Sequence, residues 1–97
     1  MNTDDSQLLR HYAEMRAEEA FAEVVRRHVD LVYSIALRQL NGDTHLAKDV
    51  VQQVFTDLAA KAGSVARHRV LAGWLFVSTR YTAAKLVRGE QRRRARE

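Results

Sequence analysis

Residues 44–62 read THLAKDVVQQVFTDLAAKA. On a helical wheel of about 100° per residue, the apolar residues of this stretch fall on one broad arc, which predicts an amphipathic helix packed against a core. That arc contains Leu46, Ala47, Val50, Val51, Val54, Leu58 and Ala62. The opposite arc contains Lys48, Asp49, Gln52, Gln53, Thr56 and Asp57, and the border between the two contains Phe55 and Ala59. An amide-rich polar face beside an aromatic ring indicates a contact surface, although Phe55 also suits the edge of the core.

Hydrophobic periodicity and stop signals predict further helices on both sides of this helix. Before it we expect helices over about Asp5–Met15, Ala17–His28 and Val29–Leu40. Asn41-Gly42-Asp43 is a break, in which Gly42 suits the position after a helix end and Asp43 or Thr44 suits the next N-cap. After it we expect Gly63 to stop the helix, a loop over Ser64–Arg69, and a long final helix over about Val70–Val87.

The composition favours an all-α fold. The 97 residues include no Pro and only four Gly, fewer than the turns of a β-rich domain would need. A chain of this length can form one modest core. We therefore predict a single domain over residues 1–97, a compact bundle of four to five helices, ordered over about 5–88 and followed by a basic tail, 89–97, that leads to a linker.

Several classes of protein are disfavoured. The chain has no Cys, which excludes disulfides and thiolate metal sites. Its four His, namely His11, His28, His45 and His68, form no i, i+4 pair, and no Gly-rich phosphate loop is present, so we expect no enzyme, no metal and no cofactor. No apolar run approaches the ~20 residues of a membrane span, and the acidic start MNTDD differs from a signal peptide. We expect a cytoplasmic protein with no membrane partner.

Charge is distributed unevenly along the chain. Residues 1–60 carry a net charge of −4, whereas residues 61–97 carry +8. A basic block on one element predicts a polyanionic partner, and the alternative is a solvated basic tail. In the final helix, Val70, Trp74, Val77 and Tyr81 form one apolar stripe, and Leu71, Leu75, Thr82 and Leu86 form a second beside it. We expect both stripes, including Trp74, to face the core.

Two segments together resemble a known family. They are HLAKDVVQQVFTDLAAKA at 45–62 and LAGWLFVSTRYTAAKLVRGEQRRR at 71–94. The first resembles the sigma-factor pattern D-hydrophobic-V-Q-E-V-F, and the second resembles the W-L-x-x-x-A-x-N-x-A-x-D-x-x-R helix that follows it. The upstream EEAFAEVVRRHVDLVYSIALRQLNGD is similar to the usual opening of the extracytoplasmic-function group. The resemblance, over about Asp5–Glu97, is to region two of bacterial RNA polymerase sigma factors of that group.

This resemblance implies two partners. The helix matching 44–62 would bind a coiled coil on the β′ subunit of core RNA polymerase. Its matching positions are Asp49, Gln52, Gln53, Phe55, Asp57 and Ala59. The final helix would capture the non-template strand of the minus-ten promoter element and help to open it. Its matching positions are Trp74, Arg80, Tyr81, Lys85, Arg88, Arg92, Arg93, Arg94 and Arg96. An anti-sigma factor is a further partner that the resemblance implies.

The chain also departs from the family pattern. Gln53 replaces a Glu, Tyr81 an Asn and Lys85 an Asp, while Leu75 replaces the second of two aromatics that open the duplex in housekeeping sigma factors. Weaker and more promoter-selective melting is expected from these changes. The family's second, helix-turn-helix domain has no counterpart here, so the sequence is either an isolated domain or part of a longer protein. The alternative functions are a free-standing basic helical DNA-binding regulator and a protein-interaction bundle.

Overall fold

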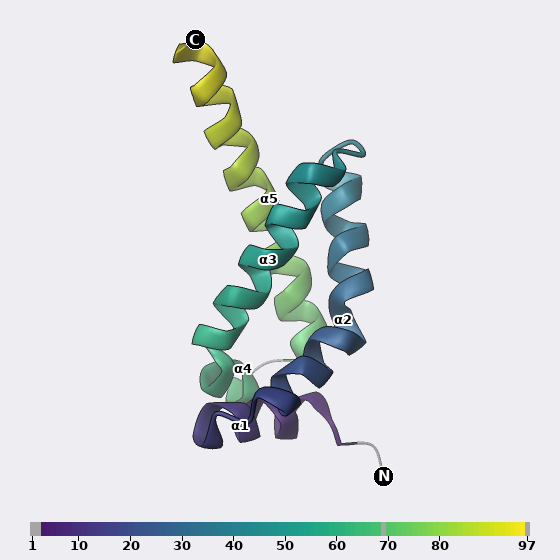
Figure 1. The fold of residues 1–97 in the computed structure, drawn as a ribbon, viewed down its shortest axis with the longest axis vertical. Coiled ribbons are helices and arrows are strands. Elements are labelled where there is room, and N and C mark those ends of the chain that lie inside the picture. Colours follow the sequence, from purple (N-terminus) through teal and green to yellow (C-terminus); the bar gives the residue numbers. More distant parts are fainter. Residues whose placement is uncertain (1–2, 69, 97) are drawn as a thin grey trace.

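The computed structural model describes residues 3–68 and 70–96, and this part of the chain forms five helices without any strand (Figure 1). The helices are α1 (Asp5–Met15), α2 (Glu18–Gln39), α3 (Thr44–Ala60), α4 (Ala62–His68) and α5 (Leu71–Arg96). The prediction of an all-α bundle is therefore confirmed.

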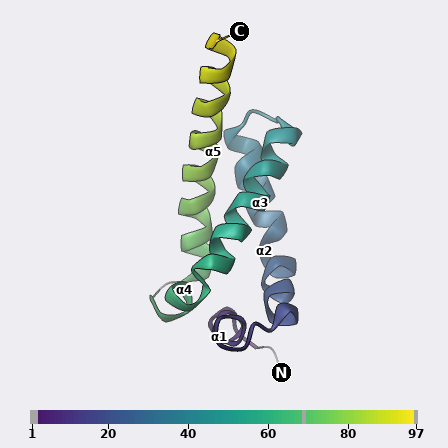
Figure 2. The same ribbon diagram turned by 60° about the vertical axis from the view of Figure 1, so that its left-hand side comes forward.

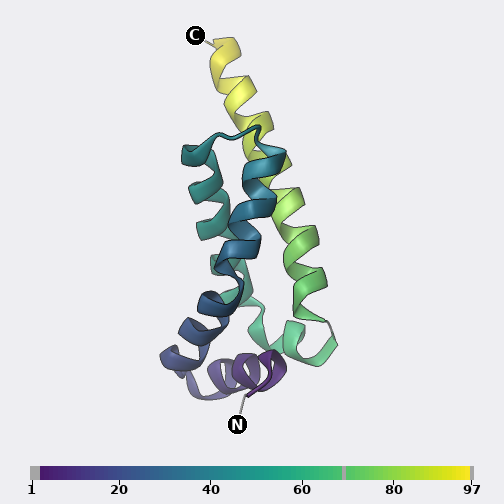
Figure 3. The ribbon, with the colours of Figure 1, turned by 90° about the vertical axis from the view of Figure 1, so that its right-hand side faces the viewer.

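Three long helices form the body of the molecule. α2, α3 and α5 lie side by side along the long axis, and each of them contacts the other two (Figures 1 and 2). α1 lies across one end of this body, against α2 and α4, while the last turns of α5 extend beyond the other end (Figure 3). The radius of gyration is 14.6 Å, compared with about 12.5 Å for a compact domain of this length. The molecule is thus elongated, with extents of 51 × 21 × 21 Å.

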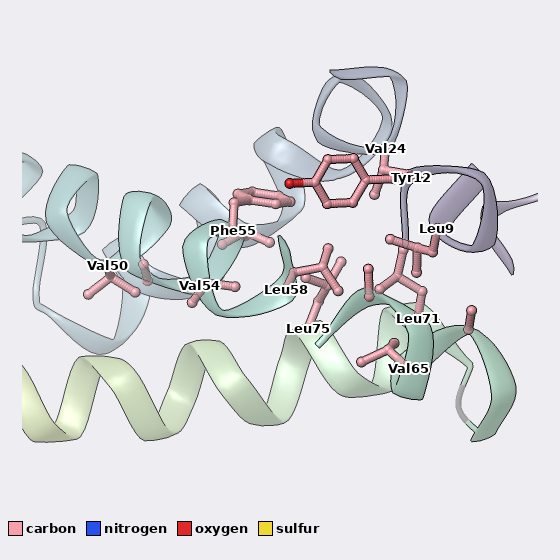
Figure 4. Close-up of a cluster of buried hydrophobic side chains, with 14 of the residues drawn as sticks. Leu9, Tyr12, Val24, Val50, Val54, Phe55, Leu58, Val65, Leu71 and Leu75 are labelled. Carbon is pink, nitrogen blue, oxygen red and sulfur yellow. The ribbon is translucent and has the colours of Figure 1, made fainter. Parts of the chain in front are cut away.

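The core lies between these helices and continues to the α1 end. α2 contributes a stripe at every fourth residue, of which Val24, Val32 and Ala36 are fully buried. α3 and α5 contribute Val50, Val54, Leu58, Leu71 and Leu75. Figure 4 shows Leu9 and Tyr12 of α1 and Val65 of α4 closing the α1 end of this cluster. Burial of apolar surface on this scale is the main stabilising contribution to a domain of this size.

Several hydrogen bonds cap α1 and hold it in place. Asp4 forms a capping box with Gln7, which satisfies free N–H groups at the start of the helix. The Ser6 hydroxyl donates a hydrogen bond of 2.8 Å to the Ala66 carbonyl of α4. Asp5 Oδ2 lies 2.8 Å from Nε2 of His28, on α2. The contacts of Ser6 and Asp5 join residues distant in sequence, so they fix α1 against α4 and α2.

One helix replaces the two predicted over Ala17–His28 and Val29–Leu40. The predicted boundary between His28 and Val29 was wrong because neither Gly nor Pro interrupts the chain there, and the buried stripe continues from Val24 to Val32 in one phase. The helix ends in a Schellman-type turn: Asn41 has a φ of 56°, and the Gly42 N–H donates to the Leu37 carbonyl at 2.9 Å. Asn41 therefore occupies the position expected for Gly42. Asp43, one of the two residues expected as the N-cap of α3, is that N-cap.

The predicted loop over Ser64–Arg69 is mostly helical. α3 ends with Lys61 as its C-cap, before Gly63, and α4 begins at Ala62. Val65 and Ala66 are buried, and α4 packs mainly on α1. This long-range contact stabilises a short helix that the local sequence pattern does not predict. Arg69, the last residue of the predicted loop, lies outside the described residues.

The predicted basic tail is a continuation of α5. The helix passes through Gly89 and reaches Arg96, although Gly costs about 1 kcal/mol in a helix interior. Good helix formers follow Gly89, and cations in the last turn interact favourably with the helix dipole. The predicted end of this helix at about Val87 was therefore wrong. Glu97, at the end of the predicted tail, lies outside the described residues. We call residues 89–96 the basic arm.

Candidate protein-binding and nucleic-acid surfaces

The polar face predicted for α3 is at the surface. Asp49, Gln52 and Gln53 are exposed, whereas Asp57 and Ala59 are half-buried. Gln53 Nε2 donates to Asp57 Oδ1 at 2.9 Å, which links two predicted contact residues one turn apart. The side chains of Asp49 and Gln52 have no hydrogen-bond partner among the described residues. This face therefore offers donors and acceptors to a partner.

Phe55 does not belong to this exposed face. Its side chain is only 7% exposed, and Figure 4 shows it in the buried cluster beside Tyr12. α3 is covered on a wide arc because α2 and α5 both pack against it, so the border position predicted for Phe55 is inside the core. As a surface anchor for a protein partner, Phe55 is corrected to a core residue.

α5 buries only one of its two predicted stripes, the one that contains Leu71 and Leu75. The buried residues are Leu71, Leu75, Thr79, Thr82 and Ala83, which face α2 and α3. The other stripe points outward: Val70 is 80% exposed, Val77 66% and Tyr81 64%, while Trp74 is half-buried against the core. The expectation that both stripes are buried was therefore wrong. The outward stripe is an apolar and aromatic surface, and contiguous surfaces of that kind mark binding sites.

A second group of exposed residues lies where α5 meets α2. The guanidinium of Arg80 sits 5.7 Å from the ring centre of Phe76, a cation–π arrangement. Gln39 Nε2 donates to the backbone carbonyl of Arg80 at 3.0 Å. These residues line a hollow together with Ile35 and Arg38. An exposed ring, an amide and two guanidinium groups thus share one concave surface.

Cations follow the aromatic residues along α5. Lys85, Arg88, Arg92, Arg93, Arg94 and Arg96 are all exposed. Because the arm is helical, these charges are held at fixed positions relative to Tyr81 and Phe76. Cations for a phosphate backbone and rings for bases are the two requirements of single-strand binding.

A family model matches most of the chain. The model for sigma-70 region 2 matches residues 24–93. The chain belongs to the sigma-70 region 2 family. Domains of this family serve in promoter recognition and RNA polymerase binding, and the family is not one of enzymes. No curated protein and no solved structure matches the chain.

The region 2 match includes both candidate surfaces. It begins inside α2, at Val24, and ends in the basic arm, at Arg93, so it contains the whole polar face of α3 and the aromatic part of α5. α1 lies before the match. In the described part of this region 2 domain, no helix is long and apolar enough to cross a membrane, and no three His, Cys, Asp or Glu side chains are grouped to hold a metal ion.

Sequence reasoning missed some residues of the α5 surface. Phe76, Val77, Arg38 and Gln39 were not predicted as binding residues, although the structure exposes Phe76 and Val77 and places Arg38 and Gln39 beside Phe76. The sequence gives only a weak indication that Phe76 and Val77 are exposed, namely that this apolar pair lies outside the stripe that includes Leu75. For Arg38 and Gln39 no local signal existed, because only the packing of α2 on α5 brings them there.

Proposed function

We propose that this chain is a region 2 domain of an extracytoplasmic-function type sigma factor, which binds the β′ coiled coil of core RNA polymerase through α3 and captures the non-template strand of the minus-ten element on α5. The observation that carries the proposal is the outward face of α5, where Val77 and Tyr81 are about two-thirds exposed beside Arg80 and Lys85. Exposed apolar and aromatic side chains that gather on one helix face are typical of a binding surface.

The chemistry of the α5 surface suits an unpaired strand. Bases stack on aromatic side chains at a gain of about 1–3 kcal/mol per base, and any base has a face to offer. Phe76 and Tyr81 provide rings, and Arg38 and Arg80 provide cations close to one of them. In duplex DNA the same bases are stacked on each other, so these rings have no partner. We therefore expect a preference for single strands.

Binding of oligonucleotides tests the strand-capture proposal. Fluorescence anisotropy with the 97-residue chain should show tighter binding to single-stranded than to fully duplex oligonucleotides of one sequence. Tyr81→Ala should weaken single-strand binding about fivefold or more, since it removes one stacking surface. Tyr33→Ala, a half-buried Tyr on α2, is the control for general loss of a ring. Equal or tighter binding to duplex, with Tyr81→Ala unchanged, would favour a duplex-binding regulator instead.

Separation of the two surfaces supports a protein partner for α3. Its exposed polar side chains and the exposed rings of α5 lie on two different helices. A half-polar helix face suits an exchangeable partner, because hydrogen bonds give specificity without a large apolar surface.

Affinity for core polymerase tests the α3 proposal. Asp49→Arg and Gln53→Arg should leave the fold intact, since both side chains are exposed. Each should reduce affinity at least about tenfold, because loss of an interface hot spot costs about 2 kcal/mol or more. Asp30→Arg, on an exposed position of α2, introduces the same charge change as Asp49→Arg and should bind like the parent. If the Asp49 and Gln53 variants also bind like the parent, this face is not the polymerase contact.

A further inference from the structure

The basic arm lies next to the start of α3. The last turns of α5 pass this end of α3 and extend beyond it (Figure 1). Two adjoining hollows lie between the two helices, and they share four lining residues: Leu46 and Asp49 of α3, and Glu90 and Arg93 of α5. Because the lining is shared, we treat the two as one and call it the arm hollow.

The arm hollow carries charges of both signs. Its basic residues come from the arm, and its acidic residues come from the arm and from the start of α3. The basic residues are Arg92, Arg93, Arg94 and Arg96, and the acidic residues are Asp43, Asp49 and Glu90. Glu90 pairs with Arg93 and lies 3.9 Å from Nε of Arg94. Asp49 and Arg92 have no ion-pair partner among residues 3–68 and 70–96, so both can pair with a partner molecule.

Apolar side chains lie among these charges. Leu46 of α3 and Leu86 of α5 are half-buried and line the arm hollow, and Gly89 leaves open space beside them, since a Cβ there would meet no atom within 4 Å. An apolar centre with a polar rim is typical of protein interfaces. A phosphate backbone, in contrast, would be repelled by the three carboxylates of the hollow. The arm hollow therefore suits a protein partner better than a nucleic acid.

We propose that the arm hollow extends the protein interface of α3, so that the coiled-coil helix bound by α3 also pairs with the arginines of the arm. The inference rests on the proposed polymerase contact of α3. Asp49 belongs both to the exposed polar face of α3 and to the lining of the hollow, so a helix about 10 Å wide that contacts Asp49 also reaches the hollow. Coiled-coil helices present acidic and basic side chains beside their apolar seam, which matches a hollow with both signs of charge.

Affinity for core RNA polymerase in the absence of DNA tests this inference. Arg93→Gln and Gln91→Glu each lower the net charge of the arm by one, but Arg93 lines the arm hollow whereas Gln91 lines a different one, with Arg88 and Ala95. Fluorescence anisotropy of the labelled 97-residue chain measures the affinity of each variant. Arg93→Gln should weaken binding about fivefold or more, because it removes one charge of an interfacial pair, and the difference should shrink as salt is added. Gln91→Glu should bind like the parent.

The outcomes separate this inference from the proposed function. Parent-like binding of Arg93→Gln, or an equal loss for Gln91→Glu, overturns the inference alone if Asp49→Arg still weakens binding. If Asp49→Arg and Gln53→Arg both bind like the parent, the proposed α3 contact fails and the inference fails with it. A loss for Arg93→Gln with oligonucleotides but not with core polymerase would assign the hollow to nucleic acid and also overturn the inference.

A second variant separates the charge of Arg93 from its effect on the helix. Arg, Gln and Lys are all good helix formers, so the arm should remain helical in each variant, and circular dichroism checks this. Arg93→Lys retains the positive charge and should restore most of the affinity that Arg93→Gln loses. Equal losses for the Lys and Gln variants would show that charge pairing at the arm hollow does not contribute to polymerase binding.

Discussion

Trp74 and Leu75 are neighbours in sequence, yet α5 gives them different environments. Leu75 is fully buried, whereas Trp74 packs partly against the core and is partly open to solvent. The family resemblance placed Leu75 where housekeeping sigma factors have a second duplex-opening aromatic. In this chain that position faces the core, so an aromatic ring there would have to displace neighbouring core residues. Any opening function at this pair therefore belongs to Trp74.

The two residues should respond differently to truncation. We expect Leu75→Ala to reduce the free energy of unfolding by about 3 kcal/mol, as for other fully buried leucines. Trp74→Ala should cost about 2 kcal/mol, below the core value for a large aromatic, because only part of its ring is buried. Urea denaturation followed by circular dichroism measures both. A Trp74→Ala protein that is less stable than Leu75→Ala would show that the ring is a main core residue.

At the scale of elements, the breaks between helices depend on backbone conformation more than on composition. Gly42 has a φ of 84° in the turn between α2 and α3. Gly63 instead lies in α4, just after the end of α3, and Gly89 lies inside α5, which it was expected to weaken. A Gly in the left-handed region avoids a strain that an L-residue would incur, so only Gly42 is required by the local geometry.

Substitution of Gly42 and of Gly73 by Ala tests which glycine the backbone geometry requires. Gly42→Ala should lower the free energy of unfolding by about 1 kcal/mol, because Ala is strained at positive φ. Gly73→Ala should raise it by about 0.5–1 kcal/mol, since Gly73 lies in α5 and a Cβ there meets no atom within 4 Å. Thermal unfolding monitored by circular dichroism gives both signs. Stabilisation by Gly42→Ala would contradict the left-handed conformation of the turn.

At the scale of the whole molecule, ionic contacts join α1 to α2 at the end opposite the basic arm. Arg27 pairs with Glu23 at 2.9 Å and with Asp5 at 3.3 Å, and His28 contacts the other oxygen of Asp5. The hydrogen bond from Arg27 lowers the pKa of Glu23 below its ordinary value of 4.5, outweighing desolvation, which acts in the opposite direction. Folding therefore favours the charged form of Glu23.

The lowered pKa of Glu23 predicts that the free energy of unfolding depends on pH in the acid range. A carboxylate whose pKa is lower in the folded state stabilises the fold above its unfolded-state pKa, and that contribution is lost as the pH falls through the folded value. Glu23→Gln should therefore be slightly less stable than the parent at pH 7, and the difference should vanish as the pH falls below the ordinary value of 4.5. Urea midpoints across a pH series provide the measurement. A difference that grows in acid would contradict the lowered pKa.

Local patterns in the sequence determined much of this structure. The all-α class, the bounds of α1, the N-cap at Asp43 and the core face of α3 follow from short-range periodicity and capping, because each depends on residues within one or two turns. The charge division between the two parts of the chain is likewise a property of the sequence alone.

Tertiary packing decided the rest. Periodicity gave α5 two adjacent apolar stripes of similar strength, and only the positions of α2 and α3 determine that the Leu75 stripe is buried and the Tyr81 stripe is exposed. In the same way, Phe55 is in the core because two helices flank α3, and α4 is helical where it packs on α1. The physical reason is common to these cases: a wheel shows which residues share a face, whereas burial depends on how many neighbours cover that face.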